Sequence, residues 1–154
     1  MPDNVPLFKV AWGRKDVRNV VDSVSRGMYW AKGPYLDEFE ERIEEYLGVD
    51  HAKVVNSGTT ALVCALKAHD IGPGDEVIVP PFTFIATANA VKLVGADPVF
   101  ADIERSTYGL NPDAVQAAIT EDTAAIMPVH VYGSVCMIES LREIANEHDL
   151  VLIE

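Results

Sequence analysis

The sequence has 154 residues, of which 49% are hydrophobic and 23% are charged. This composition is typical of a globular chain with one buried core, and it excludes disordered, collagen-like and coiled-coil chains. Twelve Lys and Arg against 24 Asp and Glu give a formal net charge of −12 at pH 7. Because an acidic surface repels nucleic-acid phosphates and anionic lipid headgroups, neither nucleic-acid nor membrane binding is expected as the main function.

Cysteine usage and hydropathy favour a cytoplasmic location. The two cysteines, Cys64 and Cys136, are too few for a disulfide framework and fit a reducing compartment. Residues 1–4 lack the basic start of a signal peptide, so none is expected. The longest uncharged run, residues 77–91, is interrupted by two prolines and is too short to span a bilayer.

Residues 1–51 are expected to form an N-terminal helical segment. Asp16 is the predicted N-cap of a first helix that ends at Gly27. The apolar stripe of this helix consists of Val17, Val20, Val21 and Val24. A second helix is predicted over 35–47, with Gly48 as its C-terminal glycine. Its acidic face could bind a metal or a partner, but a solvated helix face is the simpler interpretation. That face carries Asp37, Glu38, Glu40, Glu41, Glu44 and Glu45.

From residue 52 to residue 154, short apolar strands alternate with helical segments. Strands are predicted over 52–55, 76–79, 98–103, 124–130 and 150–153. Helices are predicted over 59–69, 83–94, 112–119 and 137–148. The third of these helices has Asn111 as its cap and Pro112 in its first turn. The alternation predicts an α/β fold with three layers and a mostly parallel sheet.

A small, hydroxyl-rich turn follows the first predicted strand, at the sheet edge where open α/β proteins bind ligands. It reads Asn56-Ser57-Gly58-Thr59-Thr60. Gly58 allows a ligand to approach the backbone closely, and the N–H groups of Thr59 and Thr60 are expected to point outward. The hydroxyls of Ser57, Thr59 and Thr60 can add donors. The turn therefore predicts a phosphate-binding cup, with simple helix capping by Ser57 as the alternative.

Several common ligand motifs do not occur in the sequence. No glycine is followed by Gly-Lys-Ser/Thr at Walker A spacing, and the pair Gly72 and Gly74 precedes a strand and lacks the third glycine of a dinucleotide fingerprint. There is no Gly-x-Ser-x-Gly elbow and no Cys/His set with zinc spacing. ATP, NAD and hydrolase chemistry are therefore not favoured, and no metal site is predicted.

Three further side chains follow predicted strands at the same edge. Phe82 and Phe84 come after the second strand, where an aromatic ring could stack on a flat cofactor. Core packing is the stronger alternative for Phe82 and the weaker one for Phe84. His130 ends the fourth strand, where a hydrogen-bonded structural role is a simpler interpretation than acid–base catalysis. Cys64 falls inside a helix and is expected to be a small buried hydrophobe.

A set of short motifs runs along nearly the whole chain: Gly33-Pro34 with Glu38-Phe39-Glu40, the run Asn56–Leu62, Gly72–Pro80, Thr83–Ala90, Gly95–Phe100, Pro128–Gly133 and the closing Val151-Leu152-Ile153-Glu154. Together, in this order and at compatible spacing, these motifs resemble the DegT/DnrJ/StrS aminotransferases.

The resemblance implies the large domain of a fold type I transferase that uses pyridoxal 5′-phosphate (PLP), usually as a homodimer. Such enzymes mostly move an amino group from glutamate to a nucleotide-linked keto-sugar. By position, the Gly58-Thr59-Thr60 turn, with Ser57 before it, matches the cup for the PLP phosphate. Phe84 matches the aromatic residue that stacks on the pyridine ring.

Two functional positions implied by the resemblance are not among the 154 residues. The Asp that binds the pyridinium nitrogen would follow Glu154, and the Schiff-base Lys would lie further on. Residues 52–154 are therefore expected to be a truncated PLP-binding domain that is inactive by itself. Two alternatives stay open: a dehydratase of the same family, with His in place of that Lys, and a non-catalytic phosphate-binding domain.

Overall fold

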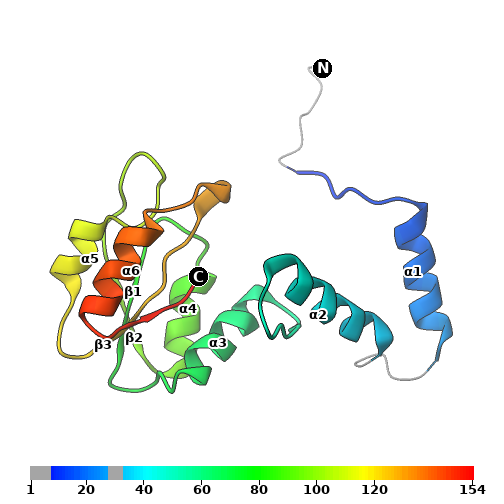
Figure 1. Cartoon of the computed structure of the whole chain (residues 1–154), viewed down its shortest axis with the longest axis horizontal. Helices are drawn as coiled ribbons and strands as arrows, with labels where there is room; N and C mark the ends of the chain where they lie inside the picture. The colour runs from blue at the N-terminus through cyan, green and yellow to red at the C-terminus, as the bar shows by residue number, and fades with distance from the viewer. Residues whose placement is uncertain (1–7, 28–32) are drawn as a thin grey trace. The chain divides into compact units, whose positions relative to one another are not determined.

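The computed structural model describes residues 8–27 and 33–154, so the N-terminal residues considered for a targeting signal lie outside it. The chain divides into two compact units, one up to Val54 and one from Val55 on (Figure 1). Within the described ranges, no helix has the length and apolar character needed to cross a membrane.

The first unit contains helices α1 (Arg14–Ser25) and α2 (Pro34–Leu47). Asp16 is not the N-cap of α1, as predicted, but its third residue. Its carboxylate accepts the backbone N–H of Gly13 at 2.7 Å, which satisfies a donor at the helix start. The predicted end of α2 is confirmed, because Gly48 adopts the left-handed conformation at φ +67°.

The predicted strand over residues 52–55 is wrong, because side chains of α2 take its backbone donors. The N–H of Ala52 donates to Glu44 Oε1 at 2.8 Å, and the N–H of Val54 donates to Glu40 Oε1 at 3.0 Å. Lys53 pairs with the same Glu40 at 2.5 Å. The Lys53 ammonium, followed by the Val54 N–H, lowers the pKa of Glu40. Part of the acidic face interpreted as solvated therefore binds the following segment.

The second unit is built on a sheet of four parallel strands in the order β2-β1-β3-β4. The strands are β1 (Glu76–Val79), β2 (Asp97–Phe100), β3 (Thr123–Ile126) and β4 (Val151–Leu152). The parallel sheet confirms the expected α/β class, although three of the strands are shorter than the apolar runs suggested.

Helices cover both faces of this sheet and give three layers. They are α3 (Gly58–Ala68), α4 (Ala86–Val94), α5 (Pro112–Ala118) and α6 (Ile138–Glu147), with a short 3₁₀ turn, η1 (Val131–Gly133). Val77 and Val79 point into a core shared with α3 and α4, whereas Ile78 points into a core shared with α5 and α6. Alternate buried residues of the central strand β1 thus pack into two cores.

Local capping agrees with the sequence at α5 and disagrees at α4. Asn111 Oδ1 accepts the N–H of Asp113 at 2.9 Å and caps α5 as predicted. Helix α4 begins at Ala86 rather than at Thr83. The segment between β1 and α4 therefore runs as an irregular loop over the carboxyl edge of the sheet, where Phe84 lies.

Candidate functional site

A cavity of about 680 Å³ lies at the carboxyl edge of the sheet. It is bordered by the start of α3, the loops after β1 and β3, and the residue that closes the described chain after β4. Of the five predicted site residues, Ser57, Gly58, Thr59 and Phe84 line this cavity, and Thr60 lies one residue further along α3. The topology thus brings together the turn and the aromatic ring predicted from the sequence.

The cup, residues 57–60, is held by a short chain of hydrogen bonds. Ser57 Oγ accepts the N–H of Thr60 at 3.1 Å and lies 3.0 Å from Thr60 Oγ1. Thr60 Oγ1 donates to Asn56 Oδ1 at 2.8 Å. Ser57 is therefore a helix cap, and the N–H of Thr60 is engaged rather than pointing outward as predicted.

Two backbone donors of the cup remain for a ligand. Among the described residues, the N–H groups of Gly58 and Thr59 have no acceptor. A Cβ built on Gly58 would meet no atom within 4 Å, so the space beside the Gly58 backbone is open. Because α3 is an 11-residue helix with its positive dipole end here, the cup fits a phosphate group.

The aromatic residues of the β1–α4 loop differ in their surroundings. Phe84 is 78% exposed and lines the cavity beside the cup. Phe82 is also exposed rather than part of the core, and its ring lies 5.9 Å from that of Tyr108 and 6.3 Å from that of Tyr132. Phe84 is therefore the ring available to pack against a flat group bound at the cup.

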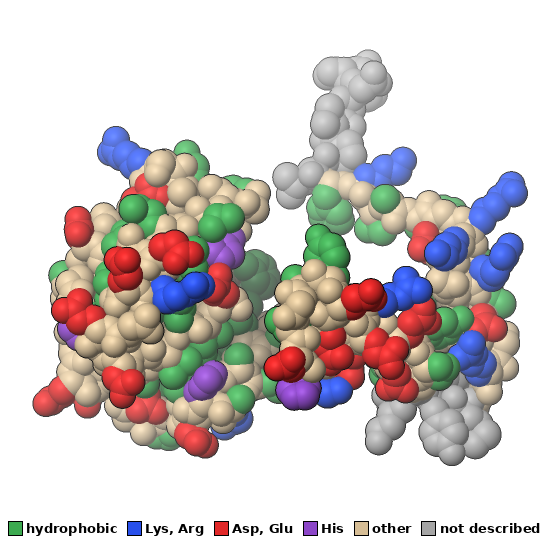
Figure 2. Space-filling view, in the orientation of Figure 1, with side chains coloured by type: hydrophobic (Ala, Val, Ile, Leu, Met, Phe, Trp, Pro, Cys, Tyr) green, Lys and Arg blue, Asp and Glu red, His purple; other side chains and the backbone are tan. Residues whose placement is uncertain are grey.

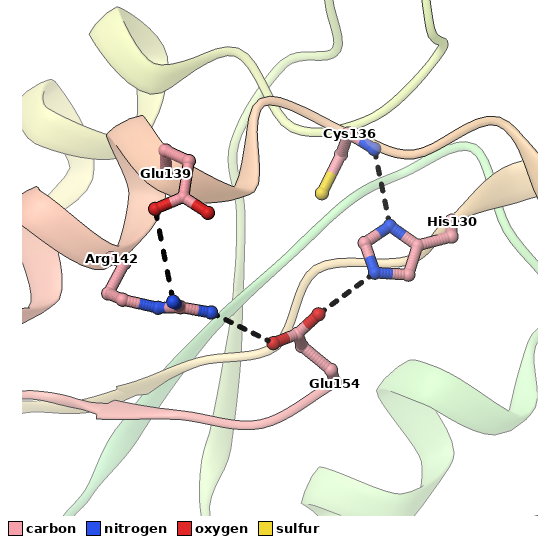
Figure 3. A network of polar contacts seen from close by, with 5 residues as sticks. All are labelled: His130, Cys136, Glu139, Arg142 and Glu154. Atoms are coloured by element: carbon pink, nitrogen blue, oxygen red, sulfur yellow. Dashed lines mark hydrogen bonds and ion pairs between the residues drawn. The ribbon is translucent and has the colours of Figure 1, made fainter. Parts of the chain in front are cut away.

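His130 lies in the loop after β3 and lines the same cavity, and both of its ring nitrogens are engaged (Figure 3). Its Nδ1 accepts the N–H of Cys136 at 3.2 Å, and its Nε2 lies 3.0 Å from Glu154 Oε2. The other carboxylate oxygen of Glu154 lies 3.7 Å from Arg142 of α6, which in turn lies 3.8 Å from Glu139. We call His130, Cys136, Arg142 and Glu154 the His130 corner. Sequence reasoning singled out His130 but missed its partners, which lie up to 24 residues away.

The two cysteines have opposite environments. Cys136 is buried, and burial followed by the negative charge of Glu154 raises the pKa of its thiol. Cys64 is exposed on α3, so the expectation of a buried Cys64 is wrong. Helical spacing placed Cys64 in the right element but could not tell which face of α3 meets the sheet.

Acidic side chains are spread over the face of the second unit that Figure 2 shows, with few Lys and Arg among them. In the part of the chain that the structure describes, no three His, Cys, Asp or Glu side chains are grouped to hold a metal ion. The polar chemistry of the cavity therefore comes from backbone N–H groups, hydroxyls and the His130 corner.

Comparison with known proteins decides the family. Residues 12–154 match the model of the DegT/DnrJ/EryC1/StrS aminotransferase family. The chain belongs to this family. The GDP-perosamine synthase of Caulobacter vibrioides is 49% identical over 154 residues, which cover 98% of this chain and 42% of that protein. The spore coat polysaccharide biosynthesis protein SpsC of Bacillus subtilis is 40% identical over 154 residues, which cover 100% of this chain and 38% of SpsC.

A solved relative agrees with the fold. The crystal structure of NtdA from Bacillus subtilis, with bound cofactor PMP, superposes with a TM-score of 0.83 at 35% identity. The match covers 91% of this chain and 33% of that one. The chain thus spans about 40% of the length of the curated relatives it matches and is a portion of a PLP-dependent aminotransferase fold.

Proposed function

We propose that this chain is the phosphate- and ring-binding portion of a PLP-dependent aminotransferase that moves an amino group from glutamate to a nucleotide-linked keto-sugar. Its similarity to a GDP-perosamine synthase supports the sugar substrate, and its similarity to a PMP-bound structure supports the cofactor. The proposal includes assembly as a homodimer in the cytoplasm.

The observation that carries the proposal is the pair of unengaged backbone donors, on Gly58 and Thr59, in the same cavity as Phe84. The two N–H groups would hold the phosphate of PLP, and Ser57 would keep the first turn of α3 in place through its bond to Thr60. The exposed ring of Phe84 would pack on the face of the pyridine ring. When bound, PLP supplies the electron sink that amino-group transfer requires.

The family's pyridinium-binding Asp and Schiff-base Lys have no counterpart in these 154 residues. We therefore propose that the chain by itself binds PLP weakly, through the phosphate and the ring face, and does not catalyse amino-group transfer. A charge-assisted hydrogen bond contributes about 1.5–3 kcal/mol, so the missing Asp alone accounts for at least about a tenfold weaker affinity.

The test is a PLP titration of the 154-residue chain and of two variants at one position. Thr59→Pro removes a backbone donor, and proline is tolerated in the first turn of a helix. Thr59→Val keeps that donor and removes only the hydroxyl. We expect Thr59→Pro to weaken PLP binding by about tenfold or more and Thr59→Val to weaken it by less.

Equal binding by the unmutated chain and Thr59→Pro would show that the phosphate binds elsewhere. Formation of PMP from PLP and glutamate by the 154-residue chain would contradict the proposed lack of catalysis. Trapping of PLP with borohydride at a lysine would contradict binding through the phosphate and the ring face alone.

A further inference from the structure

We propose that Glu154 is a positioning residue that orients the His130 ring in the wall of the PLP cavity. The inference rests on the proposed function, because the cavity it concerns is the one assigned to PLP. It goes beyond that function by giving a role to the His130 corner, which includes no donor of the phosphate cup.

The hydrogen bonds around His130 determine where its proton lies. The N–H of Cys136 can only donate, so Nδ1, 3.2 Å away, must offer a lone pair. In the neutral ring the proton is then on Nε2, and it is donated to Glu154 Oε2 at 3.0 Å. Backbone on one side and a carboxylate on the other thus fix both the tautomer and the direction of the ring.

The Glu154 carboxylate is itself held from two directions. One oxygen accepts from His130, and the other lies 3.7 Å from Arg142 Nη2 of α6 (Figure 3). The side chains of Glu154 and Arg142 are 43% and 50% exposed, so their pairing is partly screened by water. The contact with His130 is the shorter of the two.

This arrangement limits what His130 can do. Both nitrogens are engaged with protein groups, so neither is available to take a proton from a ligand. The ring instead forms part of a wall: His130, Thr83, Phe84 and Val129 line both the cavity of about 680 Å³ and a neighbouring one of about 460 Å³. A rotation of the imidazole would therefore change the shape of both cavities.

The experiment compares Glu154→Ala with Glu154→Gln in the ¹⁵N-labelled chain. Glutamine keeps an oxygen that can accept from Nε2, and alanine keeps none. Glu139→Ala is the control, because Glu139 contacts the same Arg142 but not His130. Three quantities are measured: the ring ¹⁵N shifts of His130, hydrogen exchange of the Cys136 amide, and the affinity for PLP.

The unmutated chain, Glu154→Gln and Glu139→Ala should all show the Nε2–H tautomer and a protected Cys136 amide. In Glu154→Ala the His130 signals should broaden or shift, the Cys136 amide should exchange faster, and PLP affinity should fall by about threefold to tenfold. Unfolding temperatures should stay close to that of the unmutated chain, because the side chain of Glu154 is partly exposed and its ion pair with Arg142 is screened by water.

Unchanged ring signals, amide exchange and PLP affinity in Glu154→Ala would overturn the inference, and so would equal losses in Glu154→Gln and Glu154→Ala. Failure of the unmutated chain to bind PLP would overturn the proposed function instead. In that case the His130 and Cys136 signals, recorded without PLP, would still decide whether Glu154 orients the ring.

Discussion

The two sides of the cavity differ in how their polar groups are used. At the cup, Gly58 and Thr59 present backbone N–H groups with no acceptor among the described residues. At the His130 corner, both ring nitrogens already have partners. These differences fit the proposals that the first side contacts a ligand and that the second keeps the shape of the cavity wall. A polar residue beside a cavity is thus no evidence of catalysis until its hydrogen bonds are accounted for.

The two sides also differ in how they are assembled. The bonds that hold the cup join residues within the five-residue segment from Asn56 to Thr60. The His130 corner joins the loop after β3, helix α6 and Glu154, which follows β4. The cup should therefore survive perturbations elsewhere in the second unit, while the corner should depend on the packing of several elements.

The largest expected effect comes from Gly109→Ala. A Cβ at Gly109 would lie 2.3 Å from Cys136 Cβ and 3.1 Å from its Cα, so the Cys136 backbone that bonds His130 must move. Overpacking of this kind costs about 1–3 kcal/mol. Chemical denaturation should show that loss, and the Cys136 amide should lose protection against hydrogen exchange.

Gly58→Ala is the matched control, because its new methyl group meets no atom within 4 Å. Its stability should stay within about 1 kcal/mol of the unmutated chain, since alanine is favoured over glycine in helices. Its methyl group would enter the cup, so PLP binding should weaken. Equal destabilisation by the two alanines would refute the contrast between a packed corner and an open cup.

A smaller effect is expected from Phe84→Ala. Loss of an aromatic packing partner costs about 0.5–1.5 kcal/mol, so PLP should bind about twofold to tenfold more weakly. Phe82→Ala should leave PLP affinity nearly unchanged, because Phe82 lines only the smaller cavity. Fluorescence titration of both variants measures this. A larger loss of PLP affinity in Phe82→Ala than in Phe84→Ala would show that Phe82, and not Phe84, packs on the pyridine ring.

Thiol labelling tests whether the His130 corner is closed, with the exposed Cys64 of α3 as an internal reference. Cys64 is exposed, whereas Cys136 is buried in the corner and its thiol pKa is raised by burial and by Glu154. One thiol of the native chain should react quickly with a disulfide reagent, and Cys64→Ser should abolish that fast phase. A fast phase that persists in Cys64→Ser would mean that the corner opens readily.

The smallest effect concerns acid stability of the loop that carries Gly109. The carboxylate of Glu104 accepts from the Ser106 hydroxyl at 2.5 Å, from the Thr107 hydroxyl, and from both backbone N–H groups. These bonds lower the pKa of Glu104 from 4.5 to about 2. A depressed folded-state pKa stabilises the fold above about pH 4.5, and this contribution is lost as pH falls toward about 2.

The stability difference between the unmutated chain and Glu104→Gln should therefore be largest near pH 7 and should shrink between about pH 4.5 and pH 2. Thermal unfolding at a series of pH values measures it. A difference that is constant over this range would show that the Glu104 charge does not matter to the loop.

The sequence predicted the parts of the fold that local rules govern. The buried run 76–79 is β1 with the predicted bounds, and Asn111 caps α5 as expected. The sequence also predicts that residues 57–60 and Phe84 lie at one edge of the sheet, because the carboxyl ends of parallel strands meet there, and the structure places Ser57, Gly58, Thr59 and Phe84 around one cavity.

Two of the errors arose where another group takes over a backbone donor. Glu40 and Glu44 of α2 bind Val54 and Ala52, which removes the predicted first strand. Ser57 binds the N–H of Thr60, so that among the described residues the N–H groups of Gly58 and Thr59 are the ones left without an acceptor. The pairing of His130 with Glu154 depends on the register of β3 and β4, which local sequence patterns do not specify.

The central claim is that Gly58 and Thr59 bind the phosphate of PLP. The most direct test follows backbone amide resonances of the ¹⁵N-labelled chain during addition of PLP, of inorganic phosphate, and of pyridoxal, which lacks the phosphate. PLP and phosphate should shift the amides of Gly58 and Thr59 most, and pyridoxal should leave them in place. Equal shifts of these two amides by pyridoxal, or no shift by PLP, would contradict the claim.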